Sequence, residues 1–310
     1  MSIFGRGGYG TGRGFGGGGG GKTRWIIGAV IALIGIITYF AKTEINPVTG
    51  EKQRIGMTVE QEKALGLDAA PEMAQQMGGI VDWKSDPDAE LVARVGHKLV
   101  KESDARKSPY GDNFNFYLLN DRNTVNAFAL PGGQIFITRA LFDRLENEAQ
   151  LAGVLGHEIG HVVGRHSAAQ MAKSQLGAAL VTGVAVGASG EDGAGRYAGA
   201  VAAAANQMAQ LRYGREDESQ GDSLGLRYMA QADYDPSEML NVMRILKEAA
   251  GGGRGQPEWL SSHPLPDTRI ADIEQYLAQT YPNGVPGELT DGQPLPGASG
   301  LARERRGPDR

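Results

Sequence analysis

Two histidines four residues apart, with a glutamate beside the first, are the residues of this chain best suited to chemistry. His157-Glu158-Ile159-Gly160-His161 lies in the apolar run LAGVLGHEIGHVVGRH. Histidines at this spacing project from one face of a helix, so two imidazoles can converge on a single cation. Glu158 can reach a water at that cation without binding the cation itself, and it can take a proton as the water attacks a carbonyl. The pattern predicts metal-dependent hydrolysis.

A polar patch on a surface helix is the alternative interpretation of these residues. Leu155, Ile159, Val162 and Val163 make the surrounding helix strongly apolar. Histidine and glutamate side chains without partners would be costly among such neighbours, because burial of a polar group needs compensation. The context therefore favours a metal site.

A catalytic zinc ion takes three protein ligands, so the two histidines need a third donor. The chain has no cysteine, which excludes a thiolate site and a disulfide framework. Carboxylates are abundant in the run REDESQGD at residues 215–222, on a second predicted helix. Spacing alone leaves Glu216, Asp217 and Glu218 open as the third ligand. A solvated helix face is the simpler interpretation for Glu216 and Asp217.

The elements that must position these residues are helices with one small sheet. Residues 113–119, 126–129 and 134–138 are rich in aromatic and branched side chains and predict short strands. Helical patterns cover 59–77, 87–103, 139 to beyond 166, 175–186, 197–211, 215–230, 237–249 and 267–279. Strands and helices do not alternate regularly, which argues against a doubly wound α/β domain. We expect an α+β, mainly helical fold.

The N-terminus predicts a membrane anchor. Residues 1–24 hold 12 glycines and predict a disordered leader. Residues 25–41 then run 17 residues without a charge, just long enough as a helix to cross a bilayer. A cleaved signal peptide and a buried core helix are alternatives, but Tyr39 stands where a cleavage site needs a small residue. The basic flank predicts a cytoplasmic N-terminus and a body in the periplasm, or more generally outside the cytoplasm.

Charge and composition divide the rest of the chain. Beyond residue 43 there are 26 basic and 36 acidic side chains. A body with this mildly acidic balance does not suggest nucleic acid as a partner. Residues 42–58 are expected to be a linker after the anchor, and residues 59–285 the catalytic domain. Residues 286–310 are rich in proline and glycine and predict a solvated, disordered tail.

The two motifs together resemble a known family. HEIGH at 157–161 is followed by Arg215-x-x-Glu218-x-x-Gly221-Asp222, with Glu218 57 residues after His161. This pair of motifs is similar to the gluzincins that include the HtpX, Oma and BepA-type zinc metallopeptidases and the CAAX prenyl proteases. Gly221 replaces the alanine usual in that family. The resemblance covers about residues 50–285 and includes the run NAFALPGG at 126–133. It implies a zincin-like fold, one Zn2+ per chain with His157, His161 and Glu218 as ligands, and Asp222 as a residue that orients a ligand histidine.

A third cluster follows from the same resemblance. Ser261-Ser262-His263-Pro264 precedes Arg269, and in the family a His-Pro with an arginine at this distance belongs to the active site. The resemblance implies that His263 approaches the metal or stabilises an oxyanion, and that Arg269 contributes to the same task. A helix-surface ion pair with Asp272 is the alternative for Arg269.

The remaining candidates are a strand that could bind substrate and two further histidines. Metallopeptidases of this type commonly bind an extended substrate along a sheet edge, and Gln134, Ile135 and Phe136 are the candidates for such an edge strand. An ordinary core strand is the alternative. His166 is five residues past the second ligand and His97 has no acidic or histidine neighbour at helical spacing, so both are expected to be structural.

These observations predict a membrane-anchored zinc endopeptidase that cleaves polypeptides, namely misfolded or unassembled envelope proteins. Glu158 would act as general base, with His263 and Arg269 at the oxyanion. A chaperone or assembly factor that cleaves rarely is the rival from another class. A CAAX-type processing enzyme is disfavoured, because those proteins thread several helices through the membrane and only one apolar segment is present here.

Overall fold

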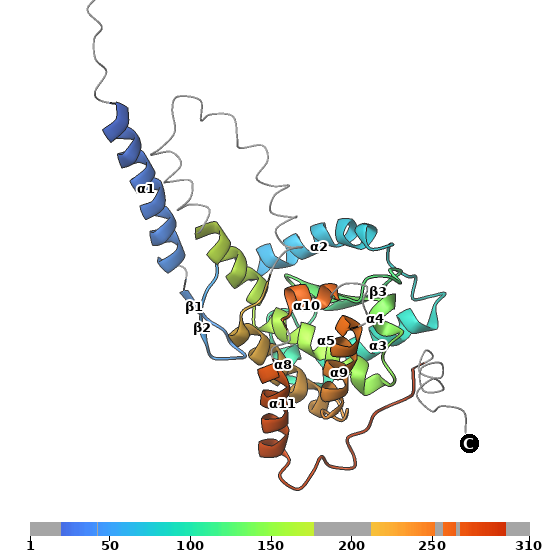
Figure 1. Ribbon diagram of the computed structural model, residues 1–310. Coiled ribbons are helices and arrows are strands. Elements are labelled where there is room, and N and C mark those ends of the chain that lie inside the picture. Colours follow the sequence, from blue (N-terminus) through green and yellow to red (C-terminus); the bar gives the residue numbers. More distant parts are fainter. Residues whose placement is uncertain (1–19, 42, 177–211, 252–256, 265–266, 296–310) are drawn as a thin grey trace, which may run out of the picture.

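Helices make up most of the residues that the structure describes, as predicted. The computed structural model describes residues 20–41, 43–176, 212–251, 257–264 and 267–295 (Figure 1). Its helices are α1 (Gly20–Ala41), α2 (Val59–Gln76), α3 (Pro87–Glu102), α4 (Arg139–Phe142), α5 (Glu148–Val163), α8 (Arg215–Gln231), α9 (Glu238–Gly251), α10 (Glu258–Ser262) and α11 (Asp267–Thr280). Its strands are β1 (Thr43–Ile45), β2 (Lys52–Arg54), β3 (Asn115–Leu119), β4 (Ala127–Leu130) and β5 (Gln134–Thr138). The prediction of a mainly helical α+β fold is confirmed.

A three-stranded sheet lies between two layers of helix. Its strands are ordered β3-β5-β4, with β3 parallel and β4 antiparallel to β5. Alternate side chains of each strand, such as Ile135 and Ile137, enter the main core with α3 and α5. The opposite side chains, including Phe136, pack against Met73 and its neighbours on α2. Because successive strand residues face opposite sides, this short sheet is buried between both layers.

The predicted edge strand is wrong. Strand β5, which carries Gln134, Ile135 and Phe136, is the central strand, and all five of its residues are buried. The parallel pairing of β3 fills one side of β5, and the hairpin at Pro131-Gly132-Gly133 folds β4 onto the other. Gly132 and Gly133 have φ of 81° and 107°, which glycine adopts without steric cost. The edge on that side of the sheet is therefore β4.

Helices α5 and α8 cross closely at two glycines. A Cβ on Gly160 would lie 2.9 Å from Gly221 O, and a Cβ on Gly221 would lie 3.1 Å from His161 Nε2. Small residues let the two backbones approach, so side chains of one helix reach those of the other. The helices pack into the core with α9 on α5 and α11 on both α8 and α9.

Helix α5 is held at its N-terminus by Asn147, whose side chain accepts from Gln150 N over 2.8 Å. Every residue of α5 is buried. The single long helix predicted from residue 139 is instead broken twice, after α4 and at Gly164-Arg165. Arg165 has φ of 56°, in the left-handed region that ends an α-helix, and helical structure resumes at His166 and continues through residue 176, where the described segment ends.

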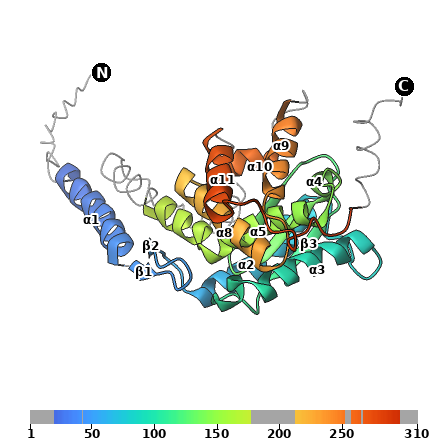
Figure 2. The same ribbon diagram turned by 90° about the horizontal axis from the view of Figure 1, so that it is seen from below.

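Helix α1 stands apart from the body and joins it through β1 and β2, as two perpendicular views show (Figure 1 and Figure 2). It begins at Gly20, so the predicted disorder of residues 20–24 is wrong, while residues 1–19 lie outside the described residues. Apolar side chains including Trp25, Ile34 and Phe40 are more than half exposed. Within the described ranges, no helix combines the length and apolarity needed to cross a membrane.

Two segments predicted to be irregular have defined structure. The linker at 42–58 contains the antiparallel hairpin of β1 and β2, in which Glu44 lies opposite Gln53. The predicted tail begins with residues packed on α5, since Glu148 N donates to Gln293 O and Leu295 is buried. Both segments are too polar or too rich in proline to show a periodic pattern. Residues 177–211, which include most of the two predicted Ala- and Gly-rich helices, and residues 296–310 lie outside the described residues.

Candidate metal centre

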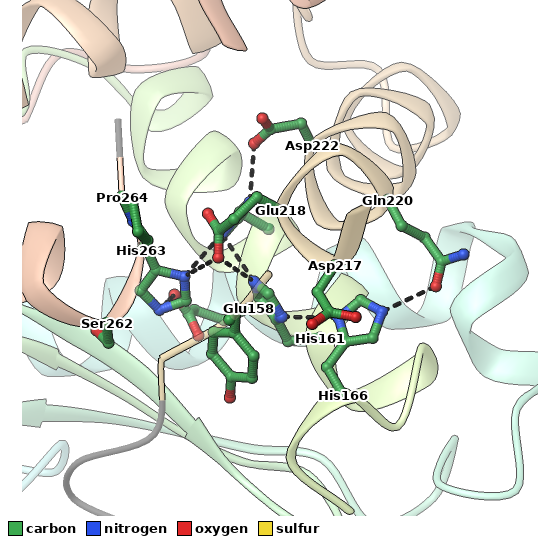
Figure 3. A network of polar contacts seen from close by, with 12 residues as sticks. Glu158, His161, His166, Asp217, Glu218, Gln220, Asp222, Ser262, His263 and Pro264 are labelled. Atoms are coloured by element: carbon green, nitrogen blue, oxygen red, sulfur yellow. Dashed lines mark hydrogen bonds and ion pairs between the residues drawn. The ribbon is translucent and has the colours of Figure 1, made fainter. Parts of the chain in front are cut away.

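Four buried side chains direct ligand atoms at one point. They are His157, His161, Glu218 and His263, and their donor atoms all lie within 4.8 Å of one another. His157 and His161 come from α5, Glu218 from the first turns of α8, and His263 from the residue that follows α10. Figure 3 shows Glu218 between the rings of His161 and His263. The sequence predictions for His157, His161 and Glu218 thus fall in a single cluster, and His263 joins them.

The separations of the donor atoms fit a tetrahedral ion. His157 Nε2 lies 3.0 Å from His161 Nε2 and 3.2 Å from His263 Nδ1. Glu218 Oε1 lies 3.5 Å from His161 Nε2 and 3.0 Å from His263 Nδ1. Donors about 2.0–2.1 Å from a tetrahedral zinc ion are roughly 3.3 Å apart. Imidazole nitrogens that face one another at these distances, with a carboxylate beside them, are a donor set that zinc prefers.

Further side chains hold the rings of the ligand histidines. His157 Nδ1 lies 2.9 Å from Asp222 Oδ1, one turn along α8 from Glu218. His161 Nδ1 lies 2.8 Å from His166 Nδ1, and His166 Nε2 lies 2.9 Å from Gln220 Oε1 (Figure 3). Such contacts fix the orientation of a ligand ring and raise its basicity.

Helical spacing predicted that His166 points away from the ligand face. The spacing no longer applies after Gly164, where the left-handed Arg165 interrupts the helix and turns His166 toward His161. His97 lies elsewhere, with its ring packed edge-on against Phe116 at 5.3 Å.

Arg269 is paired inside the site instead of on the surface of α11. Its Nε and Nη2 donate to the two carboxylate oxygens of Asp222 over 2.8 and 2.6 Å, and its Nη1 lies 2.6 Å from Glu218 Oε2. The residue is 2 % exposed. The alternative interpretation, a surface ion pair with Asp272, is therefore not what the structure shows, since two buried carboxylates are the partners of Arg269. A guanidinium engaged in this way is placed to position Glu218 and Asp222, and the expected oxyanion contact by Arg269 is not supported by its geometry.

Glu158 is fully buried and points toward His263 and Trp259. Trp259 Nε1 donates to Glu158 Oε1 over 3.3 Å, and His263 Nε2 lies 3.6 Å from the same oxygen. The other oxygen, Oε2, has no hydrogen-bonding partner among the residues that the structure describes. A buried carboxylate with one oxygen held and the other without a partner has the arrangement expected of a proton acceptor.

Burial sets the protonation of this cluster. It raises the pKa of Glu158, raises that of Glu218 to about 7 and lowers that of His263 to about 3. The pKa of His161 is lowered well below its usual value, again mainly by burial. Imidazoles kept neutral in this way retain the lone pair that a metal ion needs. For Asp222, burial is the largest single influence and favours the neutral acid, but the charges and hydrogen bonds of Arg269 and His157 together outweigh it and bring the pKa down to about 2.

A cavity of about 120 Å³ opens beside the cluster. Its walls come from α2, β4, the start of α10 and His263, and they include Met73, Met77, Phe128, Ser167 and Tyr213. Strand β4 presents its free side here. Thr138 N donates to Asn126 O, so in the antiparallel register Asn126, Phe128 and Leu130 bond to β5. Ala127 and Ala129 direct their backbone N–H and C=O groups away from β5.

Two aromatic residues of the site carry no motif and were missed by the sequence analysis. Trp259 stacks on His263 with ring centroids 4.7 Å apart, and Tyr213 stacks on His161 at 4.1 Å. The Tyr213 hydroxyl lies 2.9 Å from Ser167 Oγ. Only their positions near the motifs could have indicated a role at the site: Trp259 stands four residues before His263, and Tyr213 stands two residues before α8.

Comparisons with known proteins agree with this geometry. Residues 87–277 match Peptidase family M48. The chain is 30% identical over 250 residues to the "Beta-barrel assembly-enhancing protease" of Yersinia pestis, covering 77% of this chain and 49% of the relative. The corresponding protein of Escherichia coli K12 is 32% identical over 215 residues, covering 67% and 43%. The "Mitochondrial metalloendopeptidase OMA1" of Schizosaccharomyces pombe is 28% identical over 258 residues, covering 83% and 73%. The chain thus spans about half the length of these bacterial relatives.

Proposed function

The chain belongs to peptidase family M48, and on that premise we propose that it is a zinc-dependent endopeptidase whose ligands are His157, His161 and Glu218. The observation that carries this proposal is the meeting of these three donors beside the buried carboxylate of Glu158. They come from two helices that the chain separates by more than fifty residues. Two histidines, a glutamate ligand and an adjacent free glutamate are what metal-assisted amide hydrolysis requires.

Each residue has a defined task in the proposed reaction. A bound zinc ion supplies Lewis acidity, which polarises a carbonyl and lowers the pKa of water toward neutrality. Glu158 Oε2 accepts the proton of the attacking water and returns it to the nitrogen of the leaving amine. Trp259 holds Glu158 Oε1, and Asp222 with Arg269 holds His157 and Glu218 in place. The raised pKa of Glu158 brings its proton affinity closer to the operating pH, as a general base needs.

We place the substrate along β4. The outward backbone groups of Ala129 lie on the side of the strand away from β5, next to the cavity that His263 lines. An extended peptide can pair with them by adding a strand, which gives affinity without demanding one sequence. Met73, Met77 and Phe128 line the same cavity, and flexible methionines adapt to apolar side chains of different shape. Segments of unfolded polypeptide with apolar residues are the substrate that this cleft suits.

His263 favours a gated form of this activity. With its Nδ1 in the donor set, the four protein donors would fill all positions of a tetrahedral ion and would leave none for water. Cleavage then requires His263 to leave the cluster. This arrangement supports the second candidate function, a chaperone or assembly factor that binds its client and cleaves it rarely.

We further propose that α1 anchors the chain in a membrane with the body outside the cytoplasm, where envelope proteins are the clients. The exposed apolar side chains of α1 support this placement, since so many large apolar side chains rarely lie together on a surface that faces water. Two of the relatives carry a name that refers to β-barrel assembly, which suggests barrel precursors as clients.

A cleavage assay with the full chain in detergent tests the proposed activity. Unfolded casein should be cleaved by the zinc-loaded protein, and a chelator should stop cleavage until zinc is restored. Protection of an aggregating client by the Glu158→Gln variant would support the second candidate. No cleavage and no protection by the zinc-loaded wild type would contradict both.

A further inference from the structure

The end of the metal-binding helix is capped by a segment more than a hundred residues away in sequence. The last carbonyls of an α-helix have no partner within the helix. At the end of α5, Asn46 Nδ2 donates to Val163 O over 2.7 Å, and Gln53 Nε2 donates to Gly164 O. Asn46 is 2 % exposed, and its Oδ1 accepts from Val48 N and Thr49 N, which hold the amide in place. Both donors belong to the hairpin of β1 and β2.

The hairpin, together with α2 and the segment between them, also holds the left-handed residue that follows α5. Arg165 has φ of 56°, a conformation that is unfavourable for a residue with a Cβ. Its Nη1 donates to Glu44 Oε2 over 2.6 Å, and its Nε donates to Glu62 Oε1 over 3.0 Å. Met57 O accepts a further bond from Nη2. The turn at Gly164-Arg165 is therefore maintained by contacts from outside α5.

This turn lies directly against the metal centre. Val163 is two residues past His161, and His166, one residue past Arg165, places its Nδ1 2.8 Å from His161 Nδ1. A shift of the turn would move both the ligand ring and the residue that orients it. The hairpin that holds the turn begins at Thr43, two residues after the end of α1, and Arg54 of β2 lies over the Phe40 ring at 4.7 Å.

We propose that Asn46 and Gln53 are positioning residues of the metal site, which act on His161 through the capped end of α5. They touch neither metal nor substrate. The proposal rests on the proposed function, in which His161 is a zinc ligand, and it makes the hairpin next to α1 part of the machinery that sets zinc affinity. Any movement of α1 relative to the body is transmitted first to this hairpin.

Zinc affinity of the full-length chain tests the proposal. The dissociation constant is measured by competition with a chromophoric chelator, together with the melting temperature and the cleavage parameters kcat and KM. We expect Asn46→Ala to weaken zinc binding about tenfold, in the range seen when residues that orient metal ligands are removed. With subsaturating zinc, kcat should fall while KM stays within twofold. Gln53→Ala, at a half-buried and more tolerant position, should weaken zinc binding in the same direction.

Asn147→Ala is the matched control, because Asn147 caps the same helix at its other end. It should lower the melting temperature as much as Asn46→Ala does and leave zinc affinity within twofold. Equal losses of melting temperature with unchanged zinc affinity in all three variants would overturn the proposal and reduce the hairpin to a structural cap. Failure of the proposed function has a different signature, since wild-type protein would then bind zinc without cleaving, or would bind none.

Discussion

The indole N–H of Trp259 donates to Glu158 Oε1 over 3.3 Å, which ties the proposed base to the short helix that precedes His263. The same indole stacks on His263 with ring centroids 4.7 Å apart. One side chain therefore orients the proton acceptor and packs against the residue that fills the fourth ligand position. The general base and the gate are held together by an aromatic residue that no motif identifies.

Removing the proton acceptor should separate zinc binding from cleavage. Glu158→Gln keeps the size and the hydrogen bond from Trp259, but an amide cannot take a proton from water. We expect cleavage to fall by about 10²–10⁴-fold with one zinc per chain retained. Glu216→Gln, in the exposed part of the acidic run, should match wild type in both measurements. Substantial cleavage by Glu158→Gln would exclude Glu158 as the base.

Replacing Trp259 by phenylalanine should change the pH dependence of cleavage. The hydrogen bond from Trp259 lowers the pKa of Glu158, although burial raises it more. Without that bond the pKa of Glu158 rises, so the acidic limb of the kcat profile should move to higher pH. We expect kcat to fall about tenfold at neutral pH and KM to change little. An unchanged acidic limb in Trp259→Phe would show that the indole does not act on Glu158. Trp83→Phe, at an exposed position on the surface, is the control and should keep the wild-type pH profile.

His263→Ala distinguishes the two roles expected for this histidine. If His263 closes the site, its removal frees one position of a tetrahedral ion, and cleavage of casein should increase several-fold while zinc is retained by three donors. A role at the oxyanion predicts the opposite, a loss of about 10²-fold or more in kcat. His97→Ala, whose ring packs on Phe116 far from any of the four donors, should leave cleavage unchanged.

The pair of Asp222 and Arg269 should make the stability of the metal-free protein depend on pH. Because the interactions with Arg269 and His157 together outweigh burial, the pKa of Asp222 falls from 3.8 to about 2 on folding. A carboxyl whose folded pKa is lowered stabilises the protein above its unfolded pKa and loses that contribution as pH falls through the folded value. The shift corresponds to about 2 kcal/mol near neutral pH and roughly half of that at about pH 3.

Urea unfolding of metal-free wild type and Asp222→Asn measures this contribution. The difference in the free energy of unfolding should shrink by about 1 kcal/mol between about pH 5 and about pH 3. A difference that stays constant or widens over that interval would mean that Asp222 is not held ionised by Arg269.

Local patterns predicted most of the helices, because helix caps and hydrophobic periodicity depend on residues that are close together in the sequence. Asp86-Pro87 begins α3 as expected, with the Asp86 side chain accepting from Asp88 N and Ala89 N. The metal helix and the strands were found for the same reason. The order of the strands was not predicted, because it depends on which strands pair across the sheet and not on any local pattern. For that reason the edge was assigned to β5, although β5 lies between β3 and β4.

The site was predictable where residue types limit the chemistry, and less so where the fold decides which residues meet. The histidine pair and its glutamate follow from spacing, and the resemblance selected Glu218 among three carboxylates. The contact of His166 with His161 depends on a left-handed residue, Arg165, that is not glycine and gives no signal in sequence. Arg269 was recognised as important, but its partners Asp222 and Glu218 lie across a helix interface that spacing within α11 cannot reveal.

The zinc content of the purified chain tests the account most directly. Elemental analysis of wild type, Glu218→Ala and Glu216→Ala after dialysis against a weak chelator compares the proposed ligand with its exposed neighbour. We predict one zinc per chain in wild type and Glu216→Ala. Glu218→Ala keeps three histidine donors but loses the anionic one, and it leaves the guanidinium of Arg269, 2.6 Å from Glu218 Oε2 in the wild type, as a positive charge beside the ion. We therefore predict less than a tenth of the wild-type zinc content in Glu218→Ala. A full equivalent of zinc in Glu218→Ala, or none in wild type, would contradict the account.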